Sequence, residues 1–72
     1  MALYKRSVSL HGHRTSLALE GEFWQVIDEI AESKVMAVSA LIAEIDVARD
    51  PENSLSSAVR VHALTYALQK SS

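Results

Sequence analysis

The segment from Arg14 to Glu32 changes its hydrophobic period partway along, and this change constrains the fold more than any other feature of the chain. As far as Leu19 the pattern alternates, with Thr15, Leu17 and Leu19 on one face of an extended segment. Beyond Glu20-Gly21 the apolar residues recur at helical spacing. They are Phe23, Trp24, Ile27, Ile30 and Ala31. The pattern predicts a short strand that leads directly into an amphipathic helix.

The pairing partner of this strand is not obvious within the chain. Residues 4–10 alternate only weakly, and His11-Gly12-His13 could form a hairpin turn or a bulge in a longer strand. Residues 1–13 are therefore either a basic N-terminal arm or an extra strand. We expect the strand that begins at Arg14 to pair with its copy in a second chain. A chain of 72 residues that is 49% apolar and has no cysteine would be marginal alone, which also favours oligomerisation.

The rest of the chain is predicted to be helical. One helix is expected from about Gly21 to Ser33, and a second from Val38 to about Ala48. Asp50-Pro51 ends the second helix, and a third follows from Leu55 to about Leu68, with a frayed end. We therefore expect one domain over residues 1–72, mainly α with a short N-terminal β-ribbon. It has a strand-helix-helix core at 14–49 and a third helix within 54–69.

Charge is distributed unevenly along the chain. Residues 1–14 have a net charge of +3, residues 15–53 of −7 and residues 54–72 of +2. A basic end on an acidic body can present one positive face to a polyanion, although a solvated tail explains the charge equally well. No apolar run approaches the ~20 residues of a membrane span, and the start does not resemble a signal peptide. We expect a soluble cytoplasmic protein.

Residues that could support catalysis or bind a metal are few. No catalytic signature or glycine-rich phosphate loop is present, so we expect neither an enzyme nor a cofactor. His11 and His13, with His62 as a distant third ligand, are a weak metal signal, and contact with phosphate or backbone is favoured for the first two. Trp24 could stack on a base, but its place on the apolar stripe favours core packing.

The outward face of the predicted strand carries Arg14, Ser16 and Ala18. Two such strands paired antiparallel make a ribbon narrow enough to enter a DNA major groove. Arginine suits bidentate contact with guanine, serine can bond several base edges, and Ala18 can offer only an apolar contact. An ordinary solvent-facing strand is the alternative interpretation of this face.

The order of these elements resembles a known family. RTSLALEGEFW leading into QVIDEIAE, and later SALIAEID, are similar to ribbon-helix-helix proteins of the Arc, MetJ and CopG type, over roughly Arg14 to Arg49. The runs KRSVSLHGHRTSLALE and NSLSSAVR resemble a bacterial subgroup that has an added third helix. This resemblance implies an intertwined homodimer in which one strand from each chain forms the ribbon.

The resemblance also implies site residues. Alternate strand residues would contact DNA bases, which gives Arg14, Ser16 and Ala18. Amides at the start of the second helix would hold a phosphate, and free amides at a helix start do favour an anion. The expected contacts to the DNA backbone are Lys5, Arg6, His13, Ala37, Val38 and Ser39.

Three departures from the family pattern imply weaker or less sequence-specific binding, or more reliance on the basic arm with its His11. Lys34 or Val35 stands where the turn between the first two helices commonly has glycine. Ala37 stands where a serine or threonine cap is common, and Ala18 replaces a polar base-reading residue.

We therefore expect a homodimeric, sequence-specific DNA-binding protein that acts as a bacterial transcriptional repressor or autoregulator. The alternative is an antitoxin-like or adaptor dimer that holds a protein partner through its acidic flank or third helix, without a DNA role.

Overall fold

A β-hairpin opens the chain. The computed structural model describes residues 2–71, in which β1 (Leu3–Leu10) pairs antiparallel with β2 (His13–Glu20). His11 and Gly12 form the two-residue turn with φ angles of 52° and 84°, as a type I′ turn requires. Of the two alternatives for residues 1–13, the structure shows the extra strand, so β2 has a partner within its own chain. Alternation in residues 4–10 is weak because Arg6 occupies an inward position that an apolar residue would normally fill.

One face of the hairpin packs on the helices. Val8, Leu10, Leu17 and Leu19 are all buried, and Leu19 lies immediately before the first helix. Thr15 is directly opposite Val8 and so faces the same way, but its side chain remains exposed toward the turn end of the ribbon. This one-sided burial leaves the opposite face of both strands in solvent.

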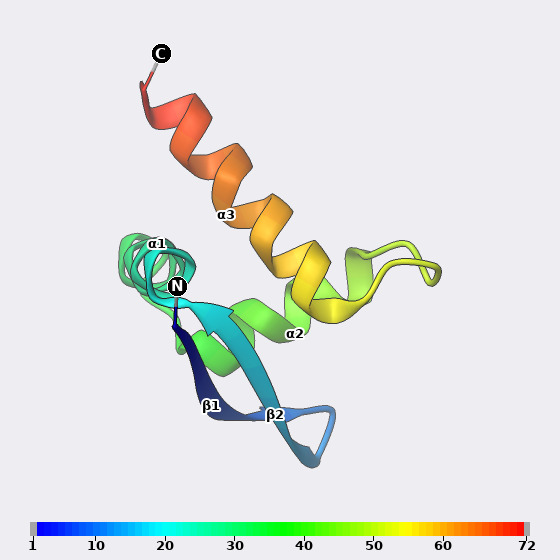
Figure 1. Cartoon of the computed structure of the whole chain (residues 1–72). Helices are drawn as coiled ribbons and strands as arrows, with labels where there is room; N and C mark the ends of the chain where they lie inside the picture. The colour runs from blue at the N-terminus through cyan, green and yellow to red at the C-terminus, as the bar shows by residue number, and fades with distance from the viewer. Residues whose placement is uncertain (1, 72) are drawn as a thin grey trace.

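Three helices follow: α1 (Gly21–Ser33), α2 (Val38–Ala48) and α3 (Leu55–Ser71). The first two match the predicted bounds. The third continues past its expected end at Leu68, because the ammonium group of Lys70 bonds Glu29 at 2.6 Å and the Ser71 hydroxyl donates to the Ala67 carbonyl. In Figure 1 the ribbon lies on one side of α1 and α2, and the C-terminal half of α3 extends from the other.

Trp24 joins the ribbon to α1. Its side chain is only 2% exposed, which confirms the prediction of core packing, and its indole N–H donates to the Tyr4 carbonyl at 2.7 Å. The remaining core comes from the inward faces of all three helices. Its buried helical members are Ile27, Ile30, Ala31, Leu41, Ile42, Ile45, Val59 and Ala63.

The turn between α1 and α2 is a Schellman motif. The Met36 amide donates to the Ala31 carbonyl and the Val35 amide to the Glu32 carbonyl. Val35 has φ of 54° and a side chain 91% exposed, so a β-branched residue occupies the left-handed conformation that favours glycine. The departure from glycine noted in the sequence therefore falls at Val35 and strains the backbone there.

We predict that Val35→Gly stabilises the protein by about 1 kcal/mol, because glycine adopts this conformation without steric cost and no buried contact is lost. Lys34→Gly is the matched control: Lys34 has φ of −93°, so glycine there gives no relief and should be destabilising. Urea denaturation would measure both variants. Equal destabilisation by the two substitutions would contradict the strain at Val35.

Candidate functional site

The solvent-facing side of the hairpin is the candidate site, and we call it the outer ribbon face. Six residues form it in three directly opposed pairs. The pairs are Lys5 with Ala18, Ser7 with Ser16, and Ser9 with Arg14. All but the partly buried Ala18 are exposed, and the face carries two positive charges and three hydroxyls. The expected trio from β2 is thus brought together with a second row of polar residues from β1.

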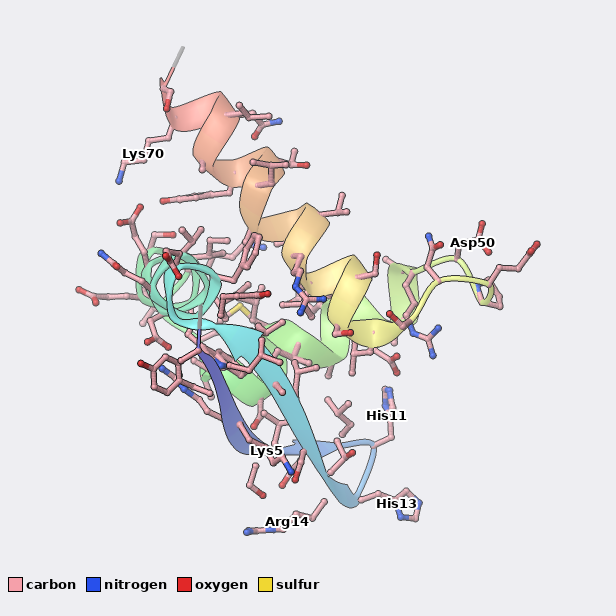
Figure 2. The ribbon with its side chains drawn as sticks, viewed as in Figure 1. Lys5, His11, His13, Arg14, Asp50 and Lys70 are labelled. Atoms are coloured by element: carbon pink, nitrogen blue, oxygen red, sulfur yellow. The ribbon has the colours of Figure 1, made fainter. Side chains whose placement is uncertain are left out.

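Ion pairing sorts the cations of the chain into two groups. Within residues 2–71, which include all seven lysines and arginines, five are ion-paired with Asp or Glu and only Lys5 and Arg14 are not. The paired cations are Arg6, Lys34, Arg49, Arg60 and Lys70. The two unpaired cations both lie on the outer ribbon face, and Figure 2 shows them on the side of the ribbon away from the helices. The acidic body therefore leaves this face positively charged.

Arg6 lies on the opposite side of β1 from Lys5. Its guanidinium makes two hydrogen bonds to Asp28, at 2.8 and 3.0 Å, and stacks 4.4 Å from the centre of the Trp24 ring. The hydrogen bonds from Arg6 hold the pKa of the Asp28 carboxyl below its ordinary value. Arg6 was expected to contact a phosphate, but in this structure it ties the ribbon to α1.

The histidines do not gather into one cluster. His11 at the turn bonds the Asp46 carboxylate on α2 at 3.1 Å, whereas His13 is exposed beside it and His62 lies on α3. The pKa of Asp46 is lowered by its hydrogen bond to Arg49 and, secondarily, by that to His11. No group of three His, Cys, Asp or Glu residues suited to a metal ion occurs within residues 2–71.

The start of α2 lies beside the outer edge of β1. The Ser39 hydroxyl is 3.4 Å from the Ser9 amide, which donates to it across the gap between helix and strand. Ala37 caps the helix without a side-chain hydrogen bond, as its methyl group dictates. The amides of Val38 and Ser39, in the first turn of α2, thus lie next to the outer ribbon face.

The outer edge of β2 exposes backbone hydrogen-bonding groups. Because the Ser9 amide points away from β2, Ser9–Arg14 is a non-hydrogen-bonded pair, and the antiparallel register makes Ser7–Ser16 and Lys5–Ala18 pairs of the same kind. The N–H and C=O groups of Arg14, Ser16 and Ala18 therefore point away from β1. No further strand pairs with this edge in the described part of the chain.

The positive charge and the narrow ribbon shape of this face suit a polyanion whose surface has a groove. Two strands about 4.8 Å apart form a ribbon that fits a DNA major groove about 12 Å wide. The arginine and hydroxyls can bond base edges, and the lysine can neutralise a phosphate. None of the described helices is long and apolar enough to cross a membrane.

Sequence reasoning missed Ser7 and Ser9 as members of the site. A signal for them was present: serines alternate with Val8 and Leu10 just before a His-Gly turn, which predicts a hairpin partner for β2. In that pairing, Lys5, Ser7 and Ser9 lie directly opposite Ala18, Ser16 and Arg14 of β2.

Comparison with models of known protein families gives a match. A family model described as a ribbon-helix-helix domain matches residues 3–67, which include both strands and most of α3. No curated protein and no solved structure was found to match the chain.

Proposed function

We propose, from the premise that this chain belongs to the ribbon-helix-helix family, that it is a homodimeric transcription regulator that binds DNA through its outer ribbon face. The observation that carries this proposal is the position of Lys5 and Arg14, the two cations that form no ion pair within residues 2–71. Phosphate neutralisation supplies much of the affinity of a DNA-binding protein, so free cations must face the duplex.

In this proposal β2 reads the bases. Arg14 can donate two hydrogen bonds to one guanine, and Ser16 can donate to or accept from a base edge. Ala18 contributes an apolar contact such as one with a thymine methyl group. The hairpin supports this assignment because β1 holds the three residues in a regular extended strand, with Arg14 and Ser16 exposed and Ala18 partly buried on the same face.

The dimer forms by pairing of the two β2 edges. The exposed backbone groups of Arg14, Ser16 and Ala18 suit antiparallel pairing with the same groups of a second copy, which gives a four-stranded sheet with β2 strands at its centre. Strand spacing then places each β1 about 7 Å from the two-fold axis, slightly beyond the half-width of about 6 Å of a major groove. The central strands enter the groove and the β1 strands lie at its rims.

The rim residues hold the DNA backbone. Lys5 lies opposite Ala18 on the outer strand, where its ammonium group can reach a phosphate. Beyond β1, the first-turn amides of α2 at Ala37, Val38 and Ser39 suit a phosphate at the positive end of the helix dipole. His13, exposed near the turn, is the third backbone contact, and Arg6 is left out because Asp28 engages it.

Occupying a promoter is sufficient for such a dimer to act as a repressor or autoregulator, and we propose this role in a bacterial cytoplasm. The alternative, a protein-interaction dimer with no DNA role, predicts that neither unpaired cation affects binding to a duplex.

We predict that Arg14→Ala weakens binding to a selected DNA site by about 1–3 kcal/mol and relaxes base preference, because a bidentate base contact is lost. Lys5→Ala should instead weaken binding to all sequences and reduce the log-log salt slope by about one for each lysine removed. Fluorescence anisotropy across a salt series, after selection from random DNA, measures both effects.

Lys70→Ala is the matched control, because that lysine is paired with Glu29 on the far helix and should leave DNA affinity unchanged. The DNA proposal fails if the wild type does not bind DNA at low salt, or if all three variants bind like the wild type.

We predict that Ser16→Pro halves the mass of the assembled protein, because proline removes an edge amide needed for β2–β2 pairing while sparing the hairpin. Ser7→Pro is the control: its amide also points away from the partner strand, but at the opposite edge of the ribbon. Sedimentation equilibrium reports the masses. A monomeric wild type at micromolar concentration, or a Ser16→Pro variant with unchanged mass, would contradict pairing through β2.

A further inference from the structure

The half of β2 that carries Arg14 has no buried side chain of its own. The side chains of His13, Arg14, Thr15 and Ser16 are all exposed, and the first buried residue of β2 is Leu17. The position of this exposed half therefore depends on its pairing with β1 and on the turn that joins the two strands.

β1 and the turn are anchored on the helices at the same end of the ribbon. Val8 and Leu10 are buried. The imidazole Nε2–H of His11, the first residue of the turn, donates to the Asp46 carboxylate on α2 at 3.1 Å. We call this hydrogen bond the turn tether, and it joins residues 35 positions apart in the sequence. In Figure 2 the His11 side chain points from the turn toward the helices, whereas that of His13 points away from them.

The acceptor of the turn tether is itself held in place. The second carboxylate oxygen of Asp46 accepts from Nε of Arg49 at 2.7 Å, and the Asp46 side chain is only 20% exposed. Arg49 in turn donates to the Asn53 carbonyl at 2.6 Å, in the loop that follows α2. Because the carboxylate is already oriented, little conformational entropy is lost when His11 binds it.

The turn itself does not call for histidine at its first position. His11 has φ of 52° and Gly12 has φ of 84°, and a type I′ turn of this kind most often has Asn-Gly at its two central residues. An asparagine side chain is shorter than histidine and would not reach Asp46. The tether to α2 thus accounts for histidine at this position where the turn geometry does not.

We infer that His11 is a positioning residue for base reading, whose tether to Asp46 holds the turn end of the ribbon on α2 and so fixes the direction of Arg14. This role rests on the proposed function, because it presupposes that Arg14 contacts a base. Arg14 lies directly opposite Ser9, whose amide donates to the Ser39 hydroxyl at the start of α2 over a long 3.4 Å. The tether adds a second, shorter contact between the ribbon and α2.

Fixing this end of the ribbon matters because a bidentate contact tolerates little displacement. A binding group has to be held within about 0.5 Å of its productive position. Movement of the turn end relative to α2 would carry Arg14 away from a base edge while the phosphate contacts at the start of α2 stayed in place. Loss of the tether should therefore reduce base discrimination more than it reduces binding to DNA in general.

His11→Asn is the sharpest test, because it removes the tether and leaves the turn with its preferred Asn-Gly pair. Discrimination is the ratio of affinities for the selected duplex and for a duplex that lacks the base pair read by Arg14. We expect His11→Asn to lower this ratio about three- to tenfold, as loss of one hydrogen bond would, and to leave the salt slope unchanged. In an Arg14→Ala background it should have no further effect on the ratio.

A second pair of variants separates the tether from a direct contact of His11 with phosphate. Asp46→Ala breaks the tether and leaves the imidazole in place, so it should lower discrimination as His11→Asn does. Arg49→Ala is the matched control, because it removes the other partner of Asp46 and keeps the tether, and it should discriminate like the wild type. Backbone order parameters from ¹⁵N relaxation of the DNA-free protein should fall at residues 11–15 in the first two variants alone.

Unchanged discrimination in His11→Asn or Asp46→Ala would overturn this role, as would unchanged order parameters in both variants. An equal loss in Arg49→Ala would overturn it too, since the effect would then come from α2 and not from the tether. If the wild type and Arg14→Ala differ in base preference while the tether variants match the wild type, the proposed function stands without this role. If the wild type does not bind DNA, both are wrong.

Discussion

Packing of one hairpin face on the helices is the interaction on which the rest of the structure depends. Leu17 and Leu19 of β2 are buried just before α1 begins, and Val8 and Leu10 extend the same apolar surface through β1. Burial of these four side chains fixes the register, because a shift of either strand by one residue would turn the two buried side chains of that strand to solvent. It also decides which residues form the outer ribbon face, since each strand presents its alternate residues on the other side.

Internal ion pairing then gives that face its charge. The chain has a formal net charge of −2, which by itself argues against a polyanionic partner. Nevertheless, five of its seven lysines and arginines pair with its own acids, and the two that remain stand on the outer ribbon face. Ion pairs at a protein surface add little stability. Their larger effect is to confine positive charge to one surface that can meet a phosphate backbone.

Local pattern was enough to predict most of the fold. The bounds of α1 and α2, the burial of Trp24 and the break at Pro51 followed from hydrophobic period and turn chemistry. The pairing of β1 with β2 did not, because the cation–π and ion-pair contacts that allow Arg6 an inward position depend on Trp24 and Asp28, about twenty residues away. Only half of the candidate outer ribbon face follows from local pattern. Alternation in β2 places Arg14, Ser16 and Ala18 on one face, whereas the position of Lys5 opposite Ala18 depends on the strand register.

The central claim is that the outer ribbon face meets DNA while α3 faces away from it. A nuclear magnetic resonance titration of the labelled protein with a short duplex tests this most directly, because amide shifts report contact residue by residue. We expect the largest changes at residues 5–9, 14–18 and 37–39, with little change along α3 beyond residue 61. Changes concentrated on α3, or none at any residue in low salt, would contradict it.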